Sequence, residues 1–312
     1  MSKKQEYTVV SLFAGAGGMD IGFELERFKT IWANDFDKDS CETHKKWSKA
    51  NVVHGPIESV DLTTIPKADV VLGGFPCQGF SLAGPRKVDD KRNILFRYFV
   101  KVIEQIQPKA FVAENVKGIL TLGGGEIIKV IIKEFSDKGY NVQFKLLNAA
   151  DYNVPEDRFR VIMVGIRKDI DTDFTYPTPA KKRVTLREAI GKMPKPKDDE
   201  VLLGGYSPRF MSRNRKRNWD EQAYTVPAMA KQVTLHPSSP DMIKVDKDLW
   251  KFGEGETRRL SWREAAAVQT FPQNMYFAGN LVSIYKQIGN AVPVNLAKSV
   301  AHELRKSLER AE

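Results

Sequence analysis

The stretch TVVSLFAGAGG at residues 8–18 decides the fold of this chain. Its first five residues are mostly β-branched and predict a buried strand, and residues 19–28 have the apolar spacing of a helix. Between them, Gly15, Gly17 and Gly18 predict a tight turn. A glycine turn between a first strand and its helix lets a ligand approach the backbone. The stretch therefore predicts the start of an α/β fold with a ligand at the turn.

The same alternation of short apolar runs and helical patterns continues through the first half of the chain. Further strands are expected at 29–34, 70–73 and 110–113, and further helices at 37–47, 94–106 and 127–135. Residues 142–147 and 161–166 then form a strand pair with no helical pattern between them. This order predicts an α/β, doubly wound, mostly parallel sheet covered by helices on both faces, with an antiparallel end.

Over residues 171–209 the regular apolar patterns give way to prolines and clustered charges, which are typical of loops. Helical spacing returns only in short stretches at 186–193 and 263–269 and in a final one at 294–308. We therefore expect two domains: 1–178 plus 280–312, and a smaller, irregular domain at 179–279.

The net charge of +10 is concentrated in the second of these domains. Residues 179–279 carry 19 Lys and Arg against 12 Asp and Glu, whereas residues 1–178 carry 25 against 24. A basic surplus confined to a third of the chain favours a nucleic-acid face there, and a merely basic, solvated surface is the alternative.

Cysteine and histidine usage excludes several classes of protein. Two cysteines rule out a disulfide scaffold and a four-thiolate zinc site, and the four histidines lack a metal-ligand spacing, so no metal is expected. No apolar run reaches about 18 residues, and the N-terminus lacks a signal-peptide stretch. The sequence predicts a soluble protein of a reducing, intracellular compartment.

The residues around the glycine turn indicate which cofactor it could hold. Asp20 stands where the pattern G-x-G-x-x-G needs its third glycine, which counts against a pyrophosphate cofactor. Asp35 closes the second strand, where it could bind ribose hydroxyls, and Phe36 beside it could stack on an adenine. This combination suits S-adenosylmethionine, and an ordinary tight strand–helix turn is the alternative.

Reactive side chains follow two further strands. Cys77 comes after Pro76 in a glycine-flanked turn at the end of the strand at 70–73, and Glu114 ends the strand that begins at 110. The carboxyl ends of parallel strands meet at one edge of a sheet, so a thiol and a carboxylate are expected together there. Arg158 and Arg160 precede the last strand, and alternation predicts that both reach the same cleft. Each residue also has a structural alternative. Cys77 could be a small buried apolar residue, Glu114 could cap the loop that follows its strand, and the two arginines could be solvated charges on an edge strand.

Taken in order, these motifs resemble the DNA cytosine-C5 methyltransferases of bacterial restriction–modification systems. The motifs that carry the resemblance are the cofactor loop at 13–18, Pro76-Cys77-Gln78, Glu114-Asn115-Val116, the arginine pair, the block from Arg258-Arg259-Leu260-Ser261 to Phe271-Pro272, and Gly289-Asn290-Ala291-Val292-Pro293. Two positions depart from the family: Glu156 replaces a frequent Gln, and Pro56 replaces an Asp that would face the adenine amino group.

The resemblance implies covalent catalysis on a cytosine flipped out of duplex DNA. Cys77 would attack carbon 6, Glu114 would hold or protonate N3, and Arg160 would bind the carbonyl oxygen of the base or position the ring. Arg158 is expected as a further catalytic residue. The methyl donor would be S-adenosylmethionine, leaving S-adenosylhomocysteine as product. The cofactor residues that the resemblance implies are Phe13, Ala14, Gly15, Gly17, Gly18, Asp35, Phe36, Ile57, Pro76, Leu95, Asn290 and Ala291.

The basic domain at 179–279 would be the target-recognition domain, and 1–178 plus 280–312 the catalytic and cofactor-binding domain. The recognition region within residues 179–279 resembles that of methyltransferases for the GGCC site. Met229-Ala230-Lys231-Gln232 stands where those enzymes often have Ser-Gly-Arg-Gln. The DNA-binding residues expected in the chain are Gln78, Ser81, Arg92, Arg209, Arg213, Asn214, Arg215, Arg217, Lys231 and Gln232.

Other functions stay open at this point. An RNA (tRNA) cytosine methyltransferase shares the motifs, and a catalytically silent DNA-binding protein shares the basic domain. An oxidoreductase is disfavoured by Asp20, and a cysteine hydrolase would need a histidine beside Cys77. The resemblance further implies a monomer that lies in the bacterial cytoplasm near the nucleoid, has no membrane partner and is paired with a restriction endonuclease.

Overall fold

The computed structural model of the chain describes residues 6–76 and 94–312. These residues form two compact units. The first unit comprises Met1–Leu147, Phe159–Thr178 and Ala297–Glu312, and the second comprises Asn148–Arg158 and Pro179–Leu296. Residues 280–296 thus lie in the second unit, while the division of the chain by function stays a prediction.

The first unit is built on a seven-stranded sheet of order β3-β2-β1-β4-β5-β8-β6. β2 and β4 run parallel to β1, β3 runs parallel to β2, and β5 runs parallel to β4, whereas β8 is antiparallel to β5. The strands are β1 (Tyr7–Leu12), β2 (Phe28–Asp35), β3 (Asn51–His54), β4 (Val70–Gly73), β5 (Ala110–Val116), β6 (Tyr140–Asn148) and β8 (Phe159–Arg167). The predicted α/β fold with a mostly parallel sheet and an antiparallel end is confirmed.

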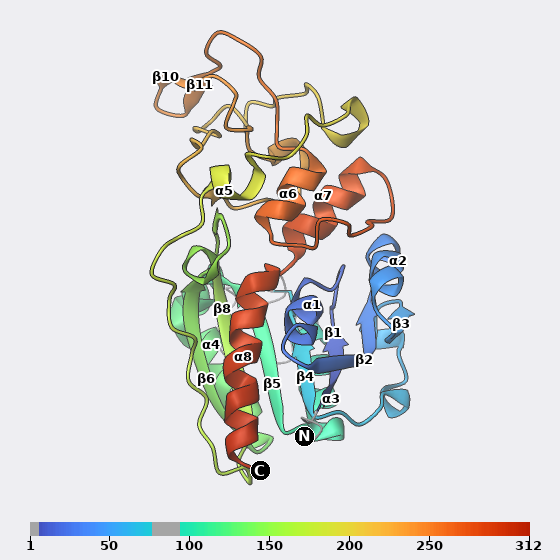
Figure 1. Cartoon of the computed structure of the whole chain (residues 1–312). Helices are drawn as coiled ribbons and strands as arrows, with labels where there is room; N and C mark the ends of the chain where they lie inside the picture. Colours follow the sequence, from blue (N-terminus) through green and yellow to red (C-terminus); the bar gives the residue numbers. More distant parts are fainter. Residues whose placement is uncertain (1–5, 77–93) are drawn as a thin grey trace. The chain divides into compact units, whose positions relative to one another are not determined.

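Helices cover this sheet, and Figure 1 shows α1 and α8 in front of it and α3 and α4 behind it. The helices of this unit are α1 (Gly18–Glu24), α2 (Lys38–Trp47), α3 (Ile94–Ile106), α4 (Glu126–Asp137) and α8 (Val294–Arg310), which begins in the second unit. The loop between β1 and α1 and the segment 74–76 after β4 therefore lie at strand ends, which is where ligands bind in open α/β sheets.

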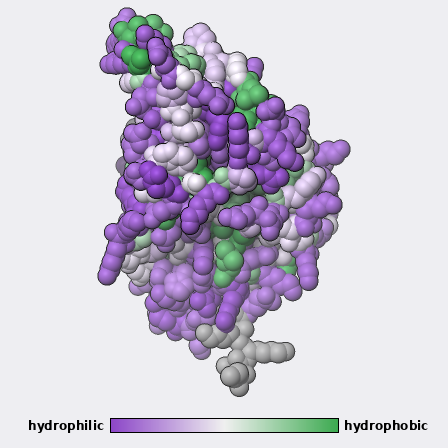
Figure 2. Space-filling view, turned by 45° about the horizontal axis from the view of Figure 1, so that its top comes forward, coloured by the Kyte–Doolittle hydropathy of each residue, from purple (hydrophilic) through white to green (hydrophobic). Residues whose placement is uncertain are grey.

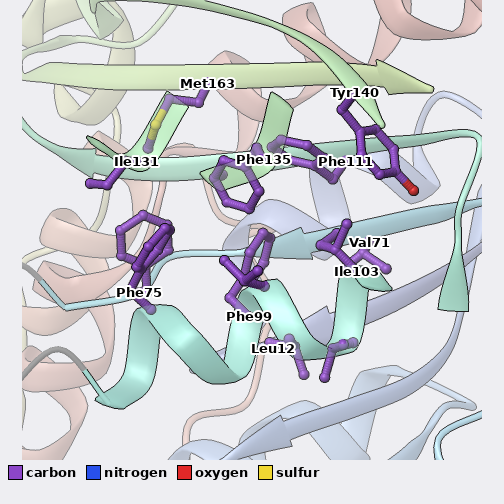
Figure 3. Packing of buried hydrophobic residues seen from close by; sticks show 14 of the residues in the cluster. Leu12, Val71, Phe75, Phe99, Ile103, Phe111, Ile131, Phe135, Tyr140 and Met163 are labelled. Carbon is purple, nitrogen blue, oxygen red and sulfur yellow. The ribbon is translucent and has the colours of Figure 1, made fainter. Parts of the chain in front are cut away.

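Aromatic side chains fill the space between the sheet and the pair α3 and α4. Phe99 of α3, Phe111 of β5 and Phe135 of α4 are fully buried, and their rings contact one another with centroids 4.3–6.1 Å apart. Figure 3 shows this cluster with Phe75, which follows β4, at its edge. A dry aromatic core of this kind holds the ends of β4 and β5 in fixed positions.

The second unit is mostly irregular. Its regular elements are β7 (Glu156–Asp157), β9 (Ala223–Tyr224), β10 (Ile243–Asp246), β11 (Leu249–Lys251), α5 (Leu186–Ile190), α6 (Trp262–Val268) and α7 (Leu281–Asn290). Capping boxes begin α5 at Thr185 and α6 at Ser261. Figure 2 shows hydrophobic side chains at the place of the β10–β11 hairpin, where Ile243, Val245 and Leu249 are exposed.

Several elements differ from those expected from the sequence, among them the short strands β7, β9, β10 and β11. The helix predicted for residues 19–28 ends at Glu24, because Arg27 adopts a left-handed φ of 65° and Phe28 starts β2, packed on Phe23. β3 shows no strand pattern of its own in the sequence, since its four residues include only two apolar ones. α7 was not predicted, although it carries the family motif at its end.

Candidate active site

The loop after β1 has the backbone that a close ligand requires. Phe13, Gly15 and Gly17 have φ values of 55°, 56° and 86°, all in the left-handed region. Such a value is easy for glycine and strained for a bulky residue such as Phe13, and strain of this kind gathers at functional sites. A Cβ at Gly15 would meet no atom within 4 Å. The loop therefore leaves open space beside its backbone.

Asp35 holds this loop in place from the end of β2. Its Oδ2 accepts the N–H of Gly15 and its Oδ1 accepts the N–H of Asp37, both at 2.8 Å. Phe36 is 66% exposed, an unusual fraction for a large aromatic residue. A carboxylate and an exposed ring beside an open glycine loop fit a nucleoside, as the sequence analysis predicts.

The segment after β3 completes this region. The N–H of Gly55 donates to the main-chain oxygen of Asp35 at 2.9 Å. Ile57 is buried in the core cluster of the first unit, and Pro56 before it has no N–H to donate. The main chain thus brings the position of Pro56 beside Asp35 even though its side chain differs from the family's Asp.

Glu114 and Arg160 form a charged pair at neighbouring strands of the first unit. β5 and β8 are adjacent antiparallel strands, and Arg160 Nε lies 2.7 Å from Glu114 Oε1. Each side chain is 13% exposed, so solvent or a ligand reaches both. A Cβ at Gly74 would come within 3.2 Å of Glu114 Oε2, so the strand end that leads to Cys77 lies against this carboxylate.

Asn115 also contributes to this site, although it was not singled out from the sequence. Its side chain is 2% exposed, and its Nδ2 donates to the carbonyl oxygen of Phe75 at 2.9 Å. It thereby ties the end of β5 to the chain two residues before Cys77. The signal was present in the sequence, because an amide beside a strand-end carboxylate is a polar residue in an otherwise apolar strand.

Several expected site residues lie outside the described residues: Cys77, Gln78, Ser81 and Arg92. Their roles stay predictions. On either side of that segment, Pro76 is exposed and Leu95 is half-buried against the core cluster. The other cysteine, Cys41, is fully buried, and burial together with nearby Asp35 raises the pKa of its thiol to about 11, which is typical of an inert structural cysteine.

Arg158 differs from Arg160 in its surroundings. The side chain is 1% exposed, and its guanidinium donates to Glu156 Oε1 and to the carbonyl oxygens of Val226, Gly289 and Ala291 at 2.7–3.3 Å. The expectation that strand alternation places both arginines on one side is wrong, because Arg158 lies between β7 and β8 and belongs to neither strand. A catalytic role for Arg158 stays a prediction.

Asn290 and Ala291 end α7 in the second unit. Asn290 is exposed, and the carbonyl oxygen of Ala291 accepts a bond from Arg158 at 3.0 Å. A side chain at Gly289 would overlap the backbone of Pro227 and Ala228, which explains the glycine. The cofactor role of the two residues stays a prediction.

The expected DNA-binding residues fall into two groups. Arg209, Arg213 and Lys231 are exposed, and Asn214 is half-buried. Arg215 and Gln232 are buried and bonded to each other at 2.7 Å, and burial, helped by the nearby Arg213 and Arg209, lowers the pKa of Arg215 to about 10.

Arg217 is half-buried and, like Arg215 and Gln232, is bonded to other side chains of the protein. It pairs with Glu221 at 2.9 Å and with Asp157 at 3.5 Å, and its guanidinium lies 4.2 Å from the ring centre of Tyr224. The structure therefore gives Arg215, Arg217 and Gln232 internal partners, and their contact with DNA stays a prediction.

No helix within residues 6–76 and 94–312 is long and apolar enough to cross a membrane. Over those same ranges, no group of three His, Cys, Asp or Glu side chains is arranged to hold a metal ion.

Comparisons with known proteins agree with this geometry. The family model for the C-5 cytosine-specific DNA methylases matches residues 7–306. The type II methyltransferase M.BsuRI of Bacillus subtilis is 44% identical, over 96% of this chain and 79% of its own length. M.FnuDI of Fusobacterium nucleatum, also a type II methyltransferase, is 44% identical over 97% of this chain and 96% of its own length.

Among solved structures, the Entamoeba histolytica methyltransferase EhMeth has a TM-score of 0.74 at 14% identity, covering 98% of this chain and 99% of its own. The Spodoptera frugiperda DNMT2 structure has a TM-score of 0.66 at 16% identity, covering 97% and 100%. These two likenesses show the fold. The family model and the close relatives show that this chain belongs to the C-5 cytosine-specific DNA methylases and is a DNA (cytosine-5)-methyltransferase.

Proposed function

We propose that this chain methylates carbon 5 of a cytosine flipped out of duplex DNA, through a transient bond between Cys77 and carbon 6. The observation that carries the proposal is the arrangement at the ends of β4 and β5. Glu114 and Arg160 lie side by side against Gly74, and Asn115 holds Phe75, two residues before Cys77. A carboxylate and a guanidinium meet there, beside the chain that leads to the thiol.

The residues of the chain would act in a defined order. The Cys77 thiolate forms a bond to carbon 6, and the π electrons of the C5–C6 bond move toward carbon 5 and the ring. Glu114 holds N3 through a proton, and Arg160 donates to the carbonyl oxygen, which stabilises the charge that the ring gains. After carbon 5 has taken a methyl group, a base removes its proton, the bond to Cys77 breaks and the thiolate is restored.

S-Adenosylmethionine supplies the methyl group as an electrophile on its sulfonium. The loop at 13–18, Asp35 and Phe36 would hold it, with Ile57, Pro76, Leu95, Asn290 and Ala291 as further contacts. The fit rests on the open space at Gly15, the carboxylate of Asp35 and the exposed ring of Phe36. Asp20 at the third glycine position is buried, so the loop lacks the cradle of a dinucleotide.

The second unit would read the DNA. Arg209, Arg213 and Lys231 are exposed cations with the chemistry for phosphates and guanines, and Asn214 suits an adenine edge or a phosphate. The resemblance of the recognition region supports GGCC as the target. Gln78, Ser81 and Arg92 would contact the DNA beside the flipped base.

The type II relatives support a place in a restriction–modification system. The enzyme would act as a monomer in the bacterial cytoplasm, near the nucleoid, and protect host DNA from a partner endonuclease.

Trapping on 5-fluorocytosine tests the covalent step. With S-adenosylmethionine and duplex DNA carrying 5-fluorocytosine within GGCC, we expect a protein–DNA adduct that survives denaturation. Carbon 5 then carries fluorine where it would carry hydrogen, and a base cannot remove the fluorine as it removes a proton, so the bond to Cys77 cannot break. Cys77→Ala should form none. An adduct that Cys77→Ala still forms would remove Cys77 from the mechanism, and an adduct only with RNA of the same sequence would reassign the substrate.

A further inference from the structure

The predicted cofactor loop rests on a ring side chain of α2, Trp47. The Nε1–H of Trp47 donates to the carbonyl oxygen of Ala16 at 3.0 Å. A Cβ at Gly17 would overlap Cζ2 of the indole and come within 3.2 Å of Cε1 of His44. The indole thus fixes one carbonyl of the loop and occupies the space that a side chain at position 17 would need.

His44 holds the indole in its plane. The two rings stack with centroids 4.7 Å apart and an interplanar angle of 15°. Residues three apart lie on one face of a helix, so α2 presents both rings to the loop. His44 is fully buried and Trp47 is half-buried, and close packing around the buried imidazole leaves it few alternative rotamers.

Asp20, in the first turn of α1, interacts electrostatically with His44. It is fully buried, and the hydroxyl of Thr30 donates to its Oδ1 at 3.4 Å. Burial raises the pKa of Asp20 and lowers that of His44, while each group opposes the shift of the other. The residue that replaces the third glycine therefore interacts with the support on α2.

The other end of α2 also reaches the loop, through Asp35. Asp37 caps α2 by accepting the N–H of Ser40 at 2.9 Å, and its own N–H donates to Asp35 Oδ1. Asp35 Oδ2 accepts the N–H of Gly15. The loop is therefore bonded to Asp35 at Gly15 and to Trp47 at Ala16, and α2 connects Trp47 back to Asp35 through Asp37. The position of the loop relative to Asp35 thus depends on Trp47.

We propose that Trp47, stacked on His44, is a positioning residue that sets the affinity of this enzyme for S-adenosylmethionine. It acts through the path of the loop at 13–18 relative to Asp35. The proposal rests on the cofactor site of the proposed function and adds a residue to it that no sequence motif of the family singled out.

Binding of S-adenosylhomocysteine, measured by titration calorimetry, tests this. Trp47→Phe keeps an aromatic ring and removes the N–H, so we expect the Kd to rise roughly two- to tenfold, the range of one net hydrogen bond. The KM for S-adenosylmethionine should rise by the same factor, with kcat and the Kd for DNA unchanged. The matched control is Trp32→Phe, which alters a buried indole of the same unit that lies in the core cluster.

A double-mutant cycle guards against a merely structural effect. Gly17→Ala adds a Cβ that overlaps the indole of Trp47 and also strains the backbone at φ 86°. The backbone strain is the same with Trp or Phe at position 47, whereas the overlap with the indole exists only with Trp. Gly17→Ala should therefore weaken binding less in the Trp47→Phe variant than in the wild type. Independent effects of the two substitutions would overturn the proposal. So would unchanged binding by Trp47→Phe, or equal weakening by Trp32→Phe. A wild-type protein that does not bind S-adenosylhomocysteine would instead remove the cofactor assignment itself.

Discussion

The two units keep their interiors together in different ways. The core of the first unit is a cluster of aromatic and aliphatic side chains, and none of the described residues of that unit is a buried arginine. The second unit has a small apolar cluster around Phe210, Leu235 and Met242, and it buries Arg158, Arg215 and Arg259 to 4% exposure or less.

The difference follows from how each unit satisfies its backbone. Strands and helices pair their own carbonyl groups, whereas irregular chain must find other donors when it is buried. An arginine offers five N–H donors, and Arg259 uses its own on the carbonyl oxygens of Leu202, Gly204, Gly205 and Lys231. Part of the basic surplus of residues 179–279, including Arg215 and Arg259, is therefore structural, and only the remaining cations would be available to DNA.

The largest effect is expected where this internal bonding is removed. Arg259→Met would leave four carbonyl oxygens without their donor and should lower the free energy of unfolding by about 3–5 kcal/mol. Urea unfolding followed by circular dichroism measures it. Arg209→Met, in the exposed group of the same unit, is the control and should change the value by no more than about 0.5 kcal/mol. Equal losses in both variants would contradict the distinction between the units.

Two of the Glu–Arg pairs, Glu114–Arg160 and Glu156–Arg158, sharpen the same contrast. Glu114→Gln should lower kcat roughly 10²–10³-fold without a change in unfolding, because a neutral amide cannot give N3 the proton that Glu114 is proposed to supply. Glu156→Gln, beside Arg158, should do the reverse: a loss of about 1 kcal/mol of stability with kcat unchanged. Methyl transfer kinetics and thermal unfolding on both variants check this, and a fall in kcat for Glu156→Gln would place the buried pair in the chemistry.

The sequence predicted the sheet, its antiparallel end and the meeting of Glu114 and Arg160, because strand order and strand-end motifs are local signals. It failed at Arg158, where the alternation argument assumed a continuous strand that the chain does not form. It also did not separate Arg215 from Arg213. That difference depends on Gln232, 17 residues further along the chain, which no local pattern reveals.

A smaller effect is expected from pH, and it concerns the second unit. His236 is 6% exposed and lies 3.5 Å from Glu264, which accepts two bonds from Arg258 at 2.8 Å. Burial, with Arg258 adding and Glu264 opposing, lowers the pKa of His236 from about 6.5 to about 4. As the pH falls, His236 is protonated in the unfolded chain at a higher pH than in the folded chain. The folded state should therefore keep its whole free energy of unfolding from this group above pH 6.5 and lose part of it between pH 6.5 and pH 4.

His236→Gln should flatten that part of the pH profile, because it removes the group that protonates only on unfolding. His302→Gln is the matched control, since His302 is 41% exposed in the first unit. Thermal unfolding between pH 4 and pH 7 measures both. A profile as steep in His236→Gln as in the wild type would show that the acid sensitivity comes from other groups.

The smallest effect is expected at single phosphate contacts, and it separates exposed arginines from paired ones. Arg213 is exposed, so Arg213→Gln should reduce the slope of log Kd against log salt for GGCC DNA by about 1. Arg217→Gln should leave the slope unchanged, because Arg217 is already balanced by Glu221 and Asp157 and releases no counterion on binding. Equal slope changes would mean that Arg217 leaves its partners for the DNA, and the internal bonding of the second unit would then have to rearrange when DNA binds.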